Sequence, residues 1–152
     1  MGKIKNFMVD YGDTSKEKKG TFTVLDTLPC AITWFYNGTN HRIEHQDKLI
    51  PLMLKNNQYV AIVQAPYSKV YNMAYIINGN GEVIWDLKDI LKGKRNIDRP
   101  LFYDVYYIND SLYFFVVVSN TDYRFEFNPY TGEVGDFIES RYYCNLQNKK
   151  LY

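Results

Sequence analysis

The sequence predicts an all-β protein, built as an antiparallel meander of hairpins. Aromatic residues make up 17% of the 152 residues, with 15 Tyr and 9 Phe, and such side chains fit a pleated, half-buried surface. Ala, the best helix former, occurs only four times. Between residues 20 and 140, short apolar or alternating segments are separated by turns rich in Asn, Asp and Gly. We therefore expect a curved sheet, a sandwich or a partly open barrel.

A chain of 152 residues has the size of one ordinary domain. We expect a single β domain over residues 20–152, preceded by a loose N-terminal arm over residues 1–19. The arm holds five Lys and three acidic residues around few apolar positions. Its alternative is one edge strand from Ile4 to Val9.

The first half of the domain contains seven segments that are rich in β-branched or aromatic residues and bounded by turn residues. The expected strands are Thr21 to Leu25, Ala31 to Tyr36, His41 to His45, Leu49 to Leu54, Tyr59 to Gln64, Val70 to Ile77 and Glu82 to Trp85. Asn37-Gly38 and Asn56-Asn57 lie between neighbouring strands, and these residues tolerate the positive φ of a tight turn. The connections are therefore expected to be hairpins.

One short helix is predicted near residues 86–92. Asp86 is placed to cap its first turn, an apolar stripe begins at Leu87, and Gly93 stands where a C-terminal cap belongs. A polar, basic loop over residues 92–99 is expected to follow and to divide the chain into two unequal halves.

The second half contains four more expected strands: Phe102 to Ile108, Ser111 to Ser119, Tyr123 to Asn128 and Glu133 to Ser140. From Tyr123 to Phe127 aromatic and charged residues alternate, as in a sheet with one face on the core. Leu112 to Val118 has no polar position, which predicts a central strand covered on both faces.

The two halves show an internal repetition. Asn56 and Asn109 open similar segments 53 residues apart, and Gly81 and Gly132 close them 51 residues apart. The hairpins at residues 76–85 and 125–134, with Gly before an acidic and a β-branched residue, resemble the last hairpin of a β-propeller blade. This resemblance implies propeller-like blades as the alternative architecture.

The N-terminal residues lack the apolar run of a secretory signal, and the longest such run, Leu112 to Val118, is far shorter than the ~20 residues of a membrane-spanning helix. We expect a soluble, cytoplasmic protein that contacts no membrane. Cys30 and Cys144, which have no metal-ligand spacing, are expected to be buried free thiols. No cofactor is expected.

The net charge of +1 conceals an uneven distribution. Residues 88–99 carry five basic and two acidic groups, a net +3, whereas residues 104–139 carry seven acidic groups and one Arg, a net −6. The seven are Asp104, Asp110, Asp122, Glu126, Glu133, Asp136 and Glu139. One interpretation is solvated charge that protects sheet edges from aggregation. The functional hypothesis is an acidic face for a basic partner, and a glycosidase-type carboxylate pair is a third interpretation.

The 26 aromatic residues, the sum of 15 Tyr, 9 Phe and 2 Trp, exceed what a core of this size readily hides. Tyr brings a large contact area and a polar tip to protein interfaces. Four tyrosines of the acidic region are therefore expected to anchor a partner, namely Tyr106, Tyr107, Tyr123 and Tyr130. Nucleic-acid binding is disfavoured because the acidic residues oppose it.

His41-Arg42-Ile43-Glu44-His45 matches the H-x-x-E-H string of inverted zinc peptidases. That chemistry needs a helix, whereas the Asn37-Gly38 turn predicts a strand in which His41 and His45 share one face. We therefore expect no metal site, with His41 and His45 as weak candidates for adventitious metal. No catalytic residues are expected, because both histidines lie here and no nucleophile elbow is present.

In general character, the chain is similar to small bacterial immunity proteins: it is a short single domain, lacks catalytic motifs and is rich in Lys, Asn, Ile and Tyr. This resemblance implies a non-catalytic protein-binding module that neutralises a cognate, basic toxin domain. The acidic, Tyr-rich face would occlude the active site of the toxin. The alternative is a small-ligand or carbohydrate-binding module that uses Trp34, Trp85 or clustered Tyr residues as stacking platforms.

Overall fold

The computed structural model describes residues 2–12 and 24–140. Its elements, in chain order, are β1 (Lys5–Asp10), the 3-10 turn η2 (Val24–Thr27), β2 (Ala31–Tyr36), β3 (Thr39–Glu44), β4 (Leu49–Met53), β5 (Tyr59–Gln64), β6 (Met73–Asn78), β7 (Val83–Asp86), α1 (Leu87–Arg95), β8 (Leu101–Ile108), β9 (Ser111–Val118), β10 (Thr121–Glu126) and β11 (Ile138–Glu139). All strand pairs are antiparallel.

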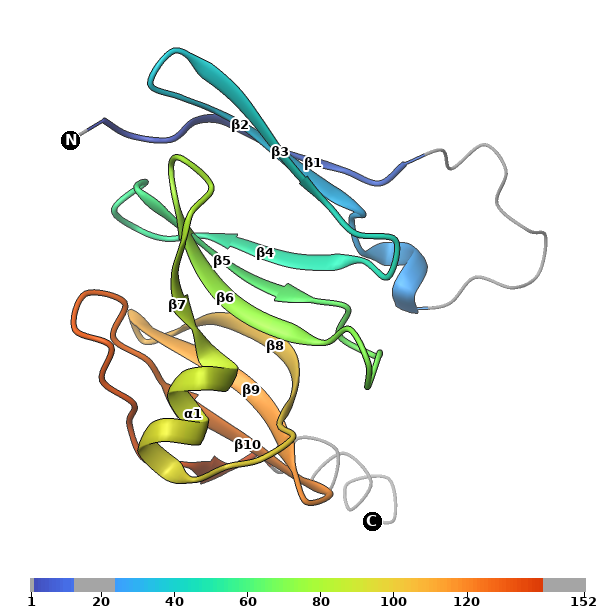
Figure 1. Cartoon of the computed structure of the whole chain (residues 1–152), viewed down its shortest axis with the longest axis vertical. Coiled ribbons are helices and arrows are strands. Elements are labelled where there is room, and N and C mark those ends of the chain that lie inside the picture. Colours follow the sequence, from blue (N-terminus) through green and yellow to red (C-terminus); the bar gives the residue numbers. More distant parts are fainter. Residues whose placement is uncertain (1, 13–23, 141–152) are drawn as a thin grey trace.

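The strands form three sheets, with the orders β1-β2-β3, β4-β5-β6-β7 and β11-β10-β9-β8. Each sheet is a local meander of the chain, and the three are stacked one upon the next (Figure 1). The all-β prediction is thereby confirmed in its sandwich form, and the described strands do not close into a barrel. The repetition predicted from the sequence corresponds to the two consecutive four-stranded meanders.

The middle sheet is buried on both faces. On β5, Val60 and Ile62 pack against the first sheet, whereas Ala61 and Val63 pack against the third. The same alternation continues on β6. Because both faces lie in a core, the strands of this sheet read as continuous apolar runs instead of alternating ones.

Two tryptophans connect each sheet to a turn of the next one. Trp34 on β2 donates its Nε1 proton to the carbonyl of Gly79 in the β6–β7 turn, at 2.7 Å. Trp85 on β7 donates to the carbonyl of Pro129 in the loop after β10, also at 2.7 Å. Burying an indole N–H requires a hydrogen-bond acceptor, so each contact fixes where the turn lies on the neighbouring sheet.

A buried asparagine connects the middle and third sheets. Asn72, which is 1% exposed, donates to the carbonyls of Gln64, Ala65 and Phe102 and accepts from the backbone N–H of Phe102 at 2.8 Å. The loop after β5 is therefore held to the beginning of strand β8. This use of residues 65–72 explains why β6 begins at Met73 and not at Val70 as predicted.

The helix is longer than expected. The Asp86 side chain accepts from the backbone N–H groups of Lys88 and Asp89, which confirms the predicted N-cap. The predicted end at Gly93 and the basic loop over residues 92–99 are wrong, because α1 continues to Arg95 and Asn96 is the left-handed C-cap, with φ 53°. Basic residues in the last turn suit the negative end of the helix dipole.

Three other sequence expectations change at the edges of the sheets. Val24 and Leu25 belong to η2 and not to a strand, while residues 21–23 lie outside the described ranges. Of the segment Glu133 to Ser140, only β11 is a strand, while Val134 forms an isolated antiparallel bridge with Phe127. At the N-terminus the edge strand is present as β1, with an irregular register between Lys5 and Met8.

Within the described ranges, no helix has the length and apolarity needed to cross a membrane. Cys30 is a half-buried free thiol whose Sγ donates to the Asp10 carbonyl at 3.4 Å, whereas Cys144 lies outside the described residues.

Gly79→Ala tests the contact between the first sheet and the β6–β7 turn. A Cβ at this position would lie 2.2 Å from the Tyr36 ring, and such overpacking costs about 1–3 kcal/mol. Gly93→Ala is the matched control, because Gly93 is an exposed position of α1 with nothing within 4 Å of an added Cβ. It should stabilise the protein by about 0.5–1 kcal/mol. Urea unfolding of both variants measures the difference, and a Gly79→Ala variant as stable as the parent would contradict this packing.

Candidate protein-binding site

The third sheet has one face on the core and one face turned away from it. On β9, Phe114 and Val116 lie in the core cluster, so the alternate residues Tyr113, Phe115 and Val117 point outward. The strand register then defines the outer face of the third sheet: Leu101, Asp104, Tyr106 and Ile108 on β8, Ser111, Tyr113, Phe115 and Val117 on β9, and Asp122, Arg124 and Glu126 on β10.

Aromatic side chains of the sheet itself cover the centre of this face. Phe115 is 5% exposed, and the Tyr106 ring stacks on it with centroids 4.5 Å apart and planes 22° apart. Tyr103, at the irregularity in the register of β8, also packs on Phe115, with ring centroids 6.0 Å apart. As predicted, the strand that contains Leu112 to Val118 is central in its sheet. Its second face is covered at Phe115 by these aromatic rings and not by another described sheet.

Three of the seven predicted carboxylates lie on this face, namely Asp104, Asp122 and Glu126. Asp104 is half-buried, and burial raises the pKa of its carboxyl, although the Val105 N–H donates to it at 2.9 Å and opposes the shift. Arg124 lies between Asp122 and Glu126 on β10, so the face has three acidic groups and one basic group. Its charge is net negative.

The other four predicted acids lie elsewhere. Asp110, in the β8–β9 turn, forms an ion pair with Lys55, and this hydrogen bond lowers the pKa of the Asp110 carboxyl. Glu133 and Asp136 are exposed residues of the loop between β10 and β11. Glu139 on β11 lies opposite Tyr123, on the other side of the sheet from Asp122. The seven acids therefore do not form one continuous face.

The four predicted tyrosine anchors are divided in the same way. Tyr106 lies on the outer face and is 43% exposed. Tyr107 and Tyr123 point to the core side, where they pack against the core cluster. Tyr130 is 64% exposed in the loop after β10, with its ring 6.2 Å from that of Tyr59.

Sequence reasoning missed Tyr103, Tyr113 and Phe115 as parts of this face. Tyr113 and Phe115 belong to the apolar run that predicted a covered strand, and their period of two already placed them opposite Leu112 and Phe114. Tyr103 reaches the face through the β8 irregularity, for which the sequence offers no signal.

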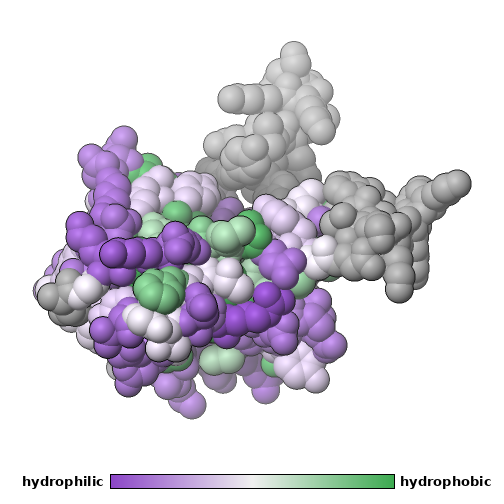
Figure 2. All heavy atoms as spheres, turned by 90° about the horizontal axis from the view of Figure 1, so that it is seen from above, coloured by the Kyte–Doolittle hydropathy of each residue, from purple (hydrophilic) through white to green (hydrophobic). Residues whose placement is uncertain are grey.

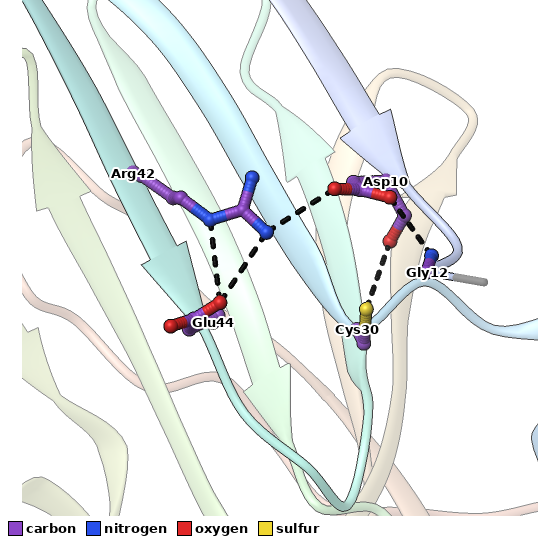
Figure 3. Close-up of polar contacts among 5 residues, drawn as sticks. All are labelled: Asp10, Gly12, Cys30, Arg42 and Glu44. Atoms are coloured by element: carbon purple, nitrogen blue, oxygen red, sulfur yellow. Dashed lines mark hydrogen bonds and ion pairs between the residues drawn. The ribbon is translucent and has the colours of Figure 1, made fainter.

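The H-x-x-E-H string lies on β3 and the turn after it, as a strand with two different faces. Arg42 and Glu44 face outward and bond to each other at 3.3 Å, and Arg42 also reaches Asp10 on β1 at 3.1 Å (Figure 3). His41 faces inward and stacks on Trp34, with centroids 5.2 Å apart. His45 lies after the strand, and its Nδ1 accepts from the Asp47 N–H at 3.0 Å.

The string is therefore a structural part of the first sheet. The Gly12 N–H and the Arg42 guanidinium both bond to the Asp10 carboxylate and lower the pKa of that group. In the described part of the chain, no group of three or more His, Cys, Asp or Glu is arranged to hold a metal ion.

Two other surfaces differ from the outer face of the third sheet. Seen from above, the side of the molecule at β1–β3 shows hydrophilic residues around small groups of hydrophobic ones (Figure 2). The β5–β6 loop exposes Tyr67, Val70 and Tyr71 by 58%, 79% and 54%. This loop carries aromatic and aliphatic side chains but none of the predicted acidic residues.

The basic residues at the end of α1 hold the loop after β10. Lys94 Nζ donates to the Gly132 carbonyl at 2.8 Å, and Arg95 donates to the carbonyls of Val134 and Gly135 at 2.6 and 3.1 Å. They therefore serve the fold, and they position the loop that carries Tyr130.

No known protein family matches the sequence, and no curated protein matches it. Among solved structures, one chain from the structure of Tne2 in complex with Tni2 is similar to this protein. The two chains share 13% sequence identity, with a TM-score of 0.65 over 91% of this chain and 99% of that chain. The likeness shows a common fold over almost the whole length of both. The resemblance to β-propeller blades gains no support from these comparisons.

The titration of Tyr103 tests the geometry of the outer face. Burial, followed by the charge of Asp122, raises the pKa of Tyr103 to about 12 from 10.0. Because the folded-state pKa is the higher one, the stability that it contributes is present below pH ~10 and is lost as the pH rises towards ~12. Asp122→Asn should therefore lower the pKa of Tyr103, measured as the phenolate absorbance that disappears in Tyr103→Phe. Asp110→Asn is the matched control, and an equal effect of both changes would contradict the placement of Asp122.

Proposed function

We propose that this protein is a non-catalytic protein-binding module, and that the outer face of the third sheet is its binding site. The observation that carries the proposal is the stack of Tyr106 on Phe115 beside half-buried and exposed carboxylates. A face that served only solubility would expose polar groups and would not place aromatic rings at its centre.

The chemistry of this face favours a protein partner. Tyr103, Tyr106 and Phe115 hold one another in place, so little side-chain entropy is lost when a partner covers them. Aromatic anchors at the centre of an interface carry most of the binding energy, while charges at its rim select the partner and speed association. Asp122 and Glu126 on the adjacent strand give the rim a negative sign.

The partner that fits is a basic protein surface. We propose that it is the active-site region of a cognate toxin, which the face would occlude, so that the chain acts as a bacterial immunity protein in the cytoplasm. The general character of the sequence supports this proposal. The chain of similar fold belongs to a complex of two proteins, Tne2 and Tni2, which supports binding to another protein.

A carbohydrate-binding module is the less favoured function. The two tryptophans among its expected stacking platforms serve the fold: Trp34 is 2% exposed beneath His41, and Trp85 packs edge-on to Phe127 and against Gly132. A sugar ring needs an open indole face, and the described surroundings of both tryptophans use that area for packing.

Charge reversal on the outer face tests the proposal. The chain is co-expressed with the product of the adjacent gene, and the complex is purified and its dissociation constant measured at two salt concentrations. Asp122→Lys with Glu126→Lys should weaken the complex about tenfold or more and reduce its salt dependence. The reason is that two favourable charge pairs become repulsive.

The matched control reverses two acids that lie off the face, Glu133→Lys with Asp136→Lys. This pair changes the net charge by the same amount, so it separates a local effect from a general one. Equal losses in the two double variants, or no loss in either, would contradict the assignment of the face. In both variants the circular dichroism spectrum should match that of the parent.

A further inference from the structure

We propose that a groove at the β8–β9 turn receives an arginine side chain of the partner; this inference rests on the proposed function and names the contact that the partner makes. The groove has a volume of about 210 Å³ and lies where the turn after β4, the β8–β9 turn and the loop after β10 meet. The residues that line it include Lys55, Tyr107, Asp110, Glu126, Pro129 and Tyr130.

A cation of the chain itself already lies in this groove. The Lys55 ammonium forms an ion pair with Asp110 and lies 4.7 Å from the centroid of the Tyr107 ring. The backbone N–H of Lys55 donates to the Tyr107 hydroxyl at 3.1 Å, which holds the ring under the ammonium. An aromatic ring with an adjacent carboxylate is a chemical environment that favours a positive charge.

The groove has more negative charge than Lys55 neutralises. Glu126 is exposed at its rim, and the described residues give its carboxylate no ion pair. With one basic and two acidic side chains, the lining keeps a net charge of −1. Charge complementarity therefore calls for a further cation in the groove.

Arginine fits this position better than lysine. Its planar guanidinium can lie flat on a tyrosine ring while its N–H groups bond to a carboxylate in pairs. Tyr130 is 64% exposed and its N–H is held by the Asn128 side chain at 2.9 Å, so an accessible ring stands on an ordered turn. Lys55 then acts as a competitor, because it occupies the neighbouring Asp110 until the guanidinium arrives.

Exchange of the two cations is feasible because the existing pair is weakly held. The side chains of Lys55 and Asp110 are 52% and 90% exposed, and exposed ion pairs contribute little. Removing the ammonium while keeping the alkyl chain, as in Lys55→Met, would leave both carboxylates for the incoming group.

The test uses the full chain and the capped peptide acetyl-Gly-Arg-Gly-amide, with acetyl-Gly-Gln-Gly-amide as the uncharged control. Binding is followed by NMR shifts of the backbone amides of Ser111, Glu126 and Tyr130. We expect arginine-dependent shifts, an affinity at least threefold higher in Lys55→Met, and an affinity at least threefold lower in Glu126→Gln. Glu133→Gln, an acid outside the groove, should bind like the parent.

Equal shifts with both peptides would overturn the inference, as would an unchanged affinity in Lys55→Met or in Glu126→Gln. The peptide assay needs no partner protein, so its outcome is separate from that of the complex assay. A complex that depends on Asp122 and Glu126 but a groove that ignores arginine would overturn this inference alone.

Discussion

The burial of the middle sheet on both faces is the constraint on which the rest of the structure depends. Because β5 and β6 send alternate residues into two different cores, each outer sheet can cover only one side of the middle one. One face of the first sheet and one face of the third are left turned away from the cores. The first carries the Arg42, Asp10 and Glu44 ion pairs, whereas the third carries a stack of aromatic rings. That chemical difference between two faces with equivalent positions is the reason why we propose the third sheet as the binding site.

The contacts between sheets fix where the candidate face lies. Trp85 and the basic end of α1 hold the loop after β10, and Asn72 holds the beginning of strand β8. These hydrogen bonds join the middle sheet and α1 to the third sheet and its loop. Loss of the partner of a buried polar group costs about 1–3 kcal/mol of stability. The outer face therefore sits on a scaffold that does not depend on a partner for its geometry, which reduces the entropy lost on binding.

Much of the fold could be predicted from local signals. The turn residues Asn37-Gly38 and the N-cap Asp86 determine their structures locally, so both are where the sequence indicated. The helix end could not be predicted in this way, since Gly93 and Asn96 are both suitable caps and the N–H of Asn96 bonds to the Leu91 carbonyl. The short β11 could not be predicted locally either, because it is defined by its pairing with Tyr123 and Arg124 of β10.

The candidate site was harder to predict than the fold. Alternation along Tyr123 to Phe127 correctly separated aromatic from charged side chains, and it also places Tyr123 on the core side of the sheet. Composition identified an acidic region, but sequence proximity does not reveal that Glu133 and Asp136 lie in a loop while Asp122 and Glu126 lie on a strand. The pairing of Asp110 with Lys55, 55 residues away, depends on the stacking of two sheets.

The most direct measurement of the central claim is amide hydrogen exchange of the protein alone and in complex with its partner. Binding through the outer face predicts slower exchange in β8, β10 and the β8–β9 turn, with little change in β1–β3. Protection confined to the first sheet, or to the β5–β6 loop with its exposed Tyr67 and Tyr71, would contradict the account.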